Sequence, residues 1–313
     1  MSGIFYHGEQ MCQGTYRNGK DCRNNAYYSI EKSMPSPQFS STLSFLRCGL
    51  HSKKGNRADL LKNPNAKKRA LDRINNHRKK VDEVAKENKA NNIRGIVVCS
   101  KLRMFKGYQS KSGYLNVFPN NRHQNRTDGF GCCSLSPMRL GPVLHNQPGL
   151  PEAKNIENFH QGNKCFSSEI DEKGDPKPIF YETQRKLYLD HIPHRHKEAA
   201  KGIKNNKNIP LFSIWKKKTG KEKRCTYIES RKYYCRYYEQ LAKKTDDYKI
   251  LARKIDDGYN LNIIGYDAYT VTKSAKEHYL DSNRPFGHEL VLYTLLTVNE
   301  KEYPWRNINC KND

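Results

Sequence analysis

The sequence predicts an α+β protein in which helices outweigh short strands. Apolar residues recur at helical spacing through the basic stretch 56–93, and an apolar run at 290–296 predicts a hydrophobic helix. Short apolar runs bounded by Gly or polar turn residues, at 96–99 and 261–267, predict strands. We therefore expect a small module at 1–55, a basic helical linker at 56–93, the main domain at 94–300 and a polar tail at 301–313 that frays.

The composition is strongly basic, with 57 Lys and Arg against 32 Asp and Glu and a formal charge of +25. Such a charge predicts attraction to phosphate-rich partners, either nucleic acid or a nucleotide, although an AT-rich coding bias would account for part of the Lys and Asn content. No apolar run approaches the ~18 residues of a transmembrane helix, and the N-terminus lacks a signal-peptide pattern, so we expect no membrane partner. The ten cysteines are then expected to be reduced. We therefore expect the protein in a reducing compartment inside the cell, the cytoplasm or the nucleus. A viral protein that works in such a compartment is also compatible with this.

The N-terminal module carries a candidate zinc site. Cys12 and Cys22 flank a Gly-containing turn, and Cys48 and His51 follow as Cys-Gly-Leu-His. Three thiolates and one imidazole form a closed tetrahedral ligand set, and so short a module has too little apolar surface to fold unaided. We therefore predict one structural zinc ion. Four unrelated buried residues are the alternative, favoured by the wide gap between Cys22 and Cys48.

The linker predicts one or two amphipathic helices with a positive outer face. A helix is expected to open near Pro64, because proline is tolerated in a first helical turn. Two interpretations stay open, a phosphate-contacting arm and a solvated linker helix. The apolar positions at helical spacing are Leu60, Leu61, Leu71, Ile74, Val81 and Val84.

The main domain begins with the strand at 96–99 and continues through a loop-rich region to the adjacent Cys132 and Cys133, which we expect in the core or a pocket wall. A helix is expected at 180–189, and three histidines follow within six residues, better suited to a pocket rim or a phosphate contact than to a metal. Two strands are expected at 211–215 and 224–228, joined by a basic turn. Helices follow at 229–239 and 248–255, and the strand at 261–267 ends on an acidic residue.

The stretch 155–166 is the strongest candidate for chemistry. Asn155 is a good N-cap, and a helix read through the stretch aligns Glu157, Gln161 and Lys164 on one face. An apolar stripe beside that face is expected to pack inward. A solvated helix face with a Glu–Lys pair is the alternative. The apolar stripe consists of Ile156, Phe159 and Phe166.

Taken together, these segments resemble the NADAR family, whose members cleave N-glycosidic bonds of ribosylated bases. The family's helix carries Glu, then Gln four residues on, then Lys seven on, as Glu157, Gln161 and Lys164 do. A loose match to its pocket-lining stretch lies at 135–138, and its strand ending in Asp corresponds to Asp267. The resemblance spans roughly 95–300. Asp267 lacks the Trp-Gly that commonly follows it in the family, and the segment 211–228 is longer than a minimal member needs.

The resemblance implies a NADAR-like glycosidase domain that removes ADP-ribose, or another ribosyl adduct, from a modified base, with nucleic acid as the favoured substrate. Lys164 is then the nucleophile, and Glu157 and Asp267 are the candidate general acid or base. Gln161 would orient a ribose hydroxyl. One objection is that Glu157 stabilises the protonated amine, whereas attack requires the neutral one. Further candidates for holding the adduct are Glu229, Arg231 and Tyr266.

A non-catalytic, zinc-containing DNA- or RNA-binding protein is the alternative, and the charge supports it directly. The two interpretations differ in where three side chains lie. Convergence of Glu157, Lys164 and Asp267 favours the glycosidase, whereas their dispersal over the surface favours the binder.

Overall fold

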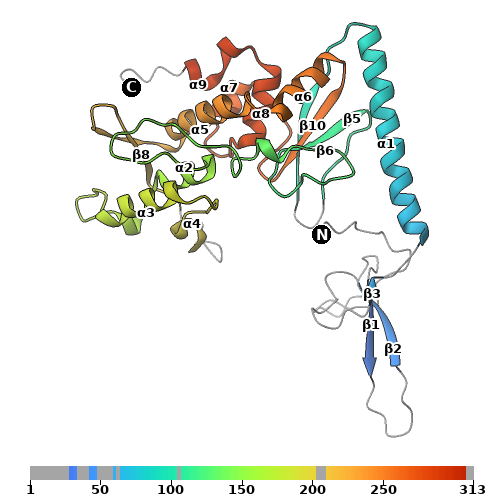
Figure 1. The fold of residues 1–313 in the computed structure, drawn as a ribbon, viewed down its shortest axis with the longest axis horizontal. Helices are drawn as coiled ribbons and strands as arrows, with labels where there is room; N and C mark the ends of the chain where they lie inside the picture. Colours follow the sequence, from blue (N-terminus) through green and yellow to red (C-terminus); the bar gives the residue numbers. More distant parts are fainter. Residues whose placement is uncertain are drawn as a thin grey trace. The chain divides into compact units, whose positions relative to one another are not determined.

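The computed structural model describes residues 28–33, 42–47, 59–60, 64–103, 107–201 and 209–307 (Figure 1). The chain divides into two compact units, Met1–Lys79 and Lys80–Asp313. It contains both helices and strands, and more residues lie in helices than in strands, as the spacing of apolar residues in the sequence predicts. Over the described ranges, no helix combines the length and the apolar character that a membrane crossing requires.

The first unit contains a small antiparallel sheet. Strand β1 (Tyr28–Ser33) pairs with β2 (Thr42–Arg47) on one side and with β3 (Asp59–Leu60) on the other. The four predicted zinc ligands, Cys12, Cys22, Cys48 and His51, lie outside the described residues, so the zinc site stays a prediction. Within the described ranges, no group of three or more His, Cys, Asp or Glu side chains is arranged to hold a metal ion.

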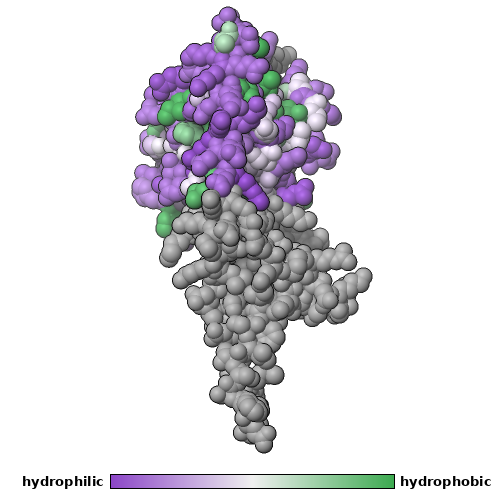
Figure 2. Space-filling view, turned by 90° about the vertical axis from the view of Figure 1, so that its right-hand side faces the viewer, coloured by the Kyte–Doolittle hydropathy of each residue, from purple (hydrophilic) through white to green (hydrophobic). Residues whose placement is uncertain are grey.

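Helix α1 (Pro64–Ala90) begins at the predicted proline and runs across the boundary between the units. In its last turns Val81 and Ala85 are buried, because Gly113 and Gly258 allow this part of the helix to pack closely against the rest of the second unit. A Cβ built on Gly258 would lie 2.7 Å from the Ala85 carbonyl oxygen, and Asn88 Nδ2 donates to the Gly258 carbonyl at 2.8 Å. The described surface on the α1 side is mostly hydrophilic (Figure 2).

A four-stranded parallel sheet forms the centre of the second unit, in the order β4 (Val97–Lys101), β10 (Asn260–Gly265), β5 (Tyr114–Phe118) and β6 (Phe130–Gly131). Every residue of β10 is buried, as expected of a central parallel strand. The strands near 96–99 and 261–267 were expected, whereas β5 and β6 fall in the region expected to be loops. Because the strands are parallel, their carboxyl ends share one edge, which is where such sheets place ligand sites.

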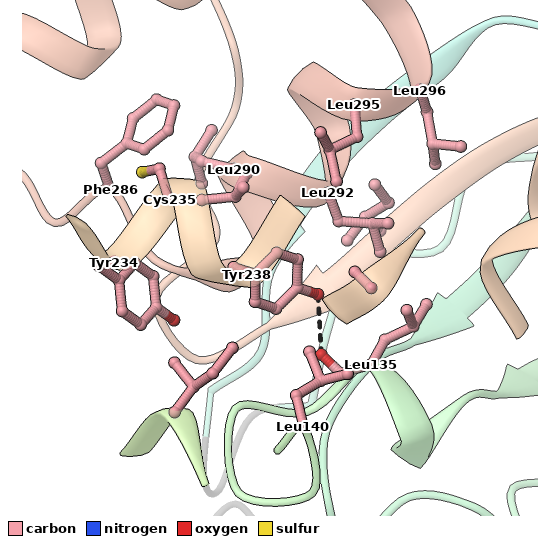
Figure 3. Packing of buried hydrophobic residues seen from close by; sticks show 14 of the residues in the cluster. Leu135, Leu140, Tyr234, Cys235, Tyr238, Phe286, Leu290, Leu292, Leu295 and Leu296 are labelled. Carbon is pink, nitrogen blue, oxygen red and sulfur yellow. Dashed lines mark hydrogen bonds between the residues drawn. The ribbon is translucent and has the colours of Figure 1, made fainter. Parts of the chain in front are cut away.

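Helices pack against this sheet through a large apolar core (Figure 3). Tyr234 and Tyr238 of α5 are buried there, and the Tyr238 hydroxyl donates to the Leu135 carbonyl at 2.7 Å. The helices and 3-10 turns of this layer are η1 (Cys133–Leu135), α5 (Tyr227–Ala242), α6 (Asp246–Asp256), α7 (Ala275–Leu280), α8 (His288–Thr297), η3 (Glu300–Glu302) and α9 (Pro304–Asn307).

A second, antiparallel sheet joins β7 (Lys164–Cys165), β8 (Phe212–Lys216) and β9 (Glu222–Cys225). The strand expected at 224–228 differs at both ends. It starts at Glu222, and it ends at Cys225 because Thr226 caps α5 and residues from 227 onward are helical. Near this sheet lie α2 (Ile156–Gly162), η2 (Ser167–Glu169), α3 (Pro178–Leu189) and α4 (Lys197–Lys201).

The beginning of the expected polar tail is packed into the core instead of fraying. Tyr303 and Trp305 are both 2% exposed. Trp305 Nε1 donates to Glu239 Oε2 at 2.7 Å, and the same carboxyl group pairs with Arg306 and with Lys243. A buried aromatic pair joined to an ion-pair cluster fixes α9 to α5.

Candidate active site

Helix α2 begins with the N-cap predicted from the sequence. The Asn155 side chain accepts the Asn158 backbone N–H at 2.8 Å, which satisfies one of the free donors of the first turn. Ile156 and Phe159 are buried below the helix. One turn apart on the opposite side, Gln161 Nε2 donates to Glu157 Oε1 at 2.8 Å.

The helix ends earlier than its sequence predicts. It stops at Gly162, whose absent Cβ leaves room for the Tyr188 ring, and Asn163 Nδ2 closes the last turn on the Phe159 carbonyl at 2.7 Å. Lys164 therefore opens strand β7 and does not lie at a helical i+7 position. Its Nζ nevertheless turns back to Gln161 Oε1, at 3.1 Å.

Glu157, Gln161 and Lys164 thus form one hydrogen-bonded array in which the Gln161 amide bridges the carboxylate and the amine. Gln161 is only 7% exposed, and its oxygen also lies 3.4 Å from the His196 backbone nitrogen. Both ends of the amide have protein partners, so this geometry suits a residue that positions Glu157 and Lys164. The ribose contact expected for Gln161 stays a prediction.

The amine of Lys164 has an unusually low pKa, about 8. Burial is the main cause, because it penalises the ammonium form, and the charge of Arg195 acts in the same direction. The carboxylates of Glu157 and Asp267 oppose the shift without cancelling it. The objection that Glu157 keeps the amine protonated is therefore real in sign and smaller than the effect of burial.

Asp267 lies just past the carboxyl end of β10, where its side chain is exposed. It packs beside Gly287, where a built Cβ would come within 3.1 Å of Asp267 Cβ. Both Glu157 and Asp267 act on the charge of Lys164, so each of the two carboxylates lies within electrostatic range of the amine.

The remaining predicted contacts differ in character. Tyr266 is 46% exposed beside Asp267, and its ring lies 6.0 Å from that of His123. Glu229 forms the capping box of α5, accepting the Thr226 N–H at 2.8 Å. Arg231 is buried and donates to backbone carbonyls of Tyr279, Asp281 and Arg284. The fold accounts for the contacts of Glu229 and Arg231, and a substrate contact for either stays a prediction.

The sequence analysis missed a buried carboxyl group, Glu289, at the start of α8. It is fully buried, its Oε2 lies 3.2 Å from His288 Nδ1, and neither carboxyl oxygen has a hydrogen bond of normal geometry with any of the described residues. A Cβ on Gly265 would overlap Glu289 Oε1, so that glycine makes room for the carboxyl group. An acidic residue directly before the apolar run 290–296 was the available signal.

One proton is shared between His288 and Glu289. His288 Nε2 lies 3.2 Å from the Pro119 carbonyl, which can only accept, so Nε2 carries a hydrogen. In neutral His288 the Nδ1 lone pair then faces Glu289, and a proton must lie between them. Burial raises the pKa of Glu289, Asp267 adds to the shift, and His288 and nearby backbone N–H groups oppose it. The raised pKa of Glu289 favours the arrangement in which its carboxyl group carries the shared proton and donates to His288 Nδ1.

A neutral histidine and a small cavity adjoin the array. Burial, together with the charge of Lys164, holds the pKa of His160 well below its ordinary value, and its ring lies 5.0 Å from that of Tyr234. The cavity is lined by Phe159, His160, Asn163, Ser213, Ile214, Trp215, Cys225, Ser230, Tyr233 and Tyr234.

Two of the three histidines at 191–196, His194 and His196, serve to hold their loop. His194 Nε2 lies 2.8 Å from Asp190 Oδ2, and the His194 N–H donates to Asn158 of α2. His196 is buried beside Phe166, 3.3 Å from the Glu169 carboxyl group. The loop thereby brings Arg195 within electrostatic range of Lys164.

No family model, no curated protein and no solved structure matches this chain.

Proposed function

We propose that this protein is an N-glycosidase that removes ADP-ribose, or a related ribosyl adduct, from a modified base, and that it is similar in mechanism to the NADAR family. The observation that carries the proposal is the low pKa of the Lys164 amine, about 8, within the array of Glu157 and Gln161 and in range of Asp267. At pH 8 about half of such amines are neutral, whereas an ordinary lysine has far fewer than one in a hundred.

The reaction begins with attack of the neutral Lys164 amine on C1′ of the ribose. The C1′–N bond breaks, and its electron pair leaves on the base nitrogen. Asp267 stabilises the positive charge that builds at C1′. Glu157 accepts the proton that the attacking amine loses and passes it to the departing base nitrogen.

Opening of the ribose ring then gives a protonated Schiff base between C1′ and Nζ of Lys164. Water adds to this iminium carbon, and the C–N bond breaks to release the free sugar and the amine. Gln161 holds Glu157 and Lys164 in register through both steps, because its amide bonds to each of them. Neither step requires an oxidant or a reductant.

The test is to trap the Schiff base. The full chain is incubated with an oligonucleotide that carries ADP-ribosylated guanine, borohydride is added, and peptides are analysed by mass spectrometry. We expect a sugar adduct on Lys164, and we expect kcat/KM to rise with pH and to level off above about 8. Lys164→Ala should lower turnover at least 100-fold.

The matched control is Lys173→Ala, which removes an exposed lysine from the loop after η2 and should keep wild-type turnover. Full turnover by Lys164→Ala with a substrate that the wild type processes would exclude amine chemistry. If the wild type processes no ribosylated nucleotide or nucleic acid, the second candidate gains support. That candidate is a non-catalytic nucleic-acid-binding protein, and the net charge of +25 favours it.

A further inference from the structure

The β8–β9 hairpin is hydrogen-bonded to the strand that carries Lys164. Lys164 pairs with Ser213, and Ser213 pairs in turn with Cys225. The end of the hairpin begins three residues beyond Ser213, which places it about 10 Å along the sheet at the usual rise per residue. A group at the hairpin end is therefore held at a defined distance from the candidate nucleophile.

The hairpin end is densely basic. Among residues 216–224 there are six cationic side chains and one acidic one, Glu222. The turn is held by two backbone hydrogen bonds of 2.8 Å between Lys217 and its neighbours Lys221 and Gly220, and Gly220 takes the positive φ that the turn requires. The six cations are Lys216, Lys217, Lys218, Lys221, Lys223 and Arg224.

Part of this charge is engaged within the protein, and part faces solvent. Arg224 pairs with Asp175, and Lys223 lies 3.5 Å from Glu229. Lys218 and Lys221 are exposed and form no ion pair with the described residues. These two cations lie on a hydrogen-bonded turn, and the pairing of β8 with β7 holds that turn at a defined distance from Lys164. This arrangement suits contact with an extended anion.

The candidate active site itself carries little positive charge. The carboxylates of Glu157 and Asp267 oppose the charge of Arg195 there, so the site does not attract polyanions by its own charge. A polyanionic substrate must gain its electrostatic affinity from beside the site. Strand β8 of the hairpin pairs with β7, the strand that carries Lys164, so the cations at the hairpin end supply positive charge beside the site.

We propose that the β8–β9 hairpin binds the phosphodiester backbone of a nucleic acid strand and thereby presents one nucleotide of that strand to Lys164. Backbone binding stands on the charge and geometry of the hairpin, whereas presentation to Lys164 rests on the proposed glycosidase function. The inference sets the substrate class as a polymer and not a free nucleotide. Contacts to phosphates carry no sequence information, so binding should be largely independent of sequence.

The first experiment measures binding of the full chain to an unmodified single-stranded oligonucleotide by fluorescence anisotropy over a range of salt concentrations. The variant Lys218→Gln with Lys221→Gln is compared with the control Lys273→Gln with Lys276→Gln, an equal charge change at exposed lysines in and beside α7. Each phosphate contact on single strands contributes about 0.7 to the slope of log K against log salt. We therefore expect the hairpin variant to lose roughly 1.4 of slope and the control to lose much less.

Equal losses in the two variants would mean that only net charge matters and would overturn the proposal. Binding of phosphatidylserine vesicles that depends on Lys218 and Lys221 as strongly as oligonucleotide binding does would also overturn it. This experiment needs no turnover, so its outcome is independent of the glycosidase proposal.

The second experiment compares the modified guanine within an oligonucleotide with the same base as a free nucleotide. We expect the hairpin variant to raise KM for the oligonucleotide at least fivefold more than KM for the free nucleotide, with kcat retained. An equal change in the two KM values would contradict presentation by the hairpin. Absence of any turnover would count against the glycosidase alone, because binding is measured separately.

Discussion

A lysine can act as a nucleophile near neutral pH only where its surroundings disfavour the ammonium form. Lys164 meets this condition through burial and the charge of Arg195, against the pull of two carboxylates. Gln161 lies between the amine and the Glu157 carboxylate, because its amide hydrogen-bonds to both groups. A direct Glu157–Lys164 ion pair would stabilise the ammonium form more strongly, so the bridging amide preserves the reactive one.

At the same scale, Glu289 offers a test of the proton placed between it and His288. Glu289→Gln keeps the shape of a protonated carboxyl group and keeps a donor for His288 Nδ1. We therefore expect turnover within about threefold of wild type, and the loss of one infrared band from a carboxyl group that titrates above the ordinary range for Glu in the wild type. Severe loss of turnover in a folded variant would show that Glu289 works as a carboxylate.

The control for this variant is Glu239→Gln, another buried carboxyl group. Glu239 pairs with Lys243 and Arg306 and accepts the Trp305 indole N–H. Its replacement should lower the free energy of unfolding by about 2 kcal/mol or more, because it leaves buried partners of a charge unsatisfied, and should leave the infrared band in place.

At the scale of elements, the connection from α2 to β7 decides where Lys164 lies. Asn163 is 8% exposed, and its side chain donates to the Phe159 carbonyl while its oxygen accepts from Gln184 at 3.1 Å and from the Tyr188 hydroxyl at 3.0 Å. These contacts turn the chain out of the helix one residue before Lys164. The position of the amine therefore depends on α3, which supplies both donors.

Asn163→Ala should lower the free energy of unfolding by about 2–3 kcal/mol, since it leaves buried donors and a carbonyl without partners. Turnover should fall in the fraction that stays folded, because Lys164 follows directly. Urea unfolding and single-turnover kinetics measure the two effects. Thr183→Ala on α3, which removes only a hydroxyl bonded back to its own helix, is the control and should change stability by less than about 0.5 kcal/mol. A similar stability for both variants would contradict this account of the turn.

The sequence predicted those elements whose signals are local. Helix α6 (Asp246–Asp256) covers the helix expected at 248–255, and α8 (His288–Thr297) contains the expected apolar run 290–296. Features that depend on contacts between distant parts of the chain were not predicted from the sequence. The end of α2 has both a local signal, the Gly162-Asn163 pair, and a tertiary one, the Tyr188 ring that α3 packs against Gly162, whereas the two-residue β6 exists only through its pairing with β5. Glu289 was hidden for the same reason, since its burial follows from Gly265 on β10.

At the scale of the whole molecule, charge and chemistry occupy different places. The net charge of +25 belongs to the chain as a whole, whereas the carboxyl groups gather at the edge of the parallel sheet and beside α2.

Buried histidines also lie within the second unit in neutral form. His145 is 4% exposed, its Nε2–H donates to the Pro151 carbonyl at 2.8 Å, and its Nδ1 accepts the Gln147 N–H at 3.0 Å. This pairing fixes the tautomer and leaves no place for a second proton.

Stability should therefore fall as the solution becomes mildly acidic. Burial lowers the pKa of His145 and His278, and lowers that of His160 further, whereas an unfolded chain titrates near 6.5. Below pH 6.5 the unfolded state binds protons that the native state does not, so the free energy of unfolding decreases with decreasing pH until the lowered native pKa values are reached. Each such histidine contributes up to about 1 kcal/mol between pH 6.5 and 5.5. Urea unfolding of wild type and His145→Asn from pH 7.5 to 5.5 measures this, and the variant should show the smaller dependence on pH. Equal slopes for the two proteins would mean that His145 takes up its proton as readily in the fold as in the unfolded chain.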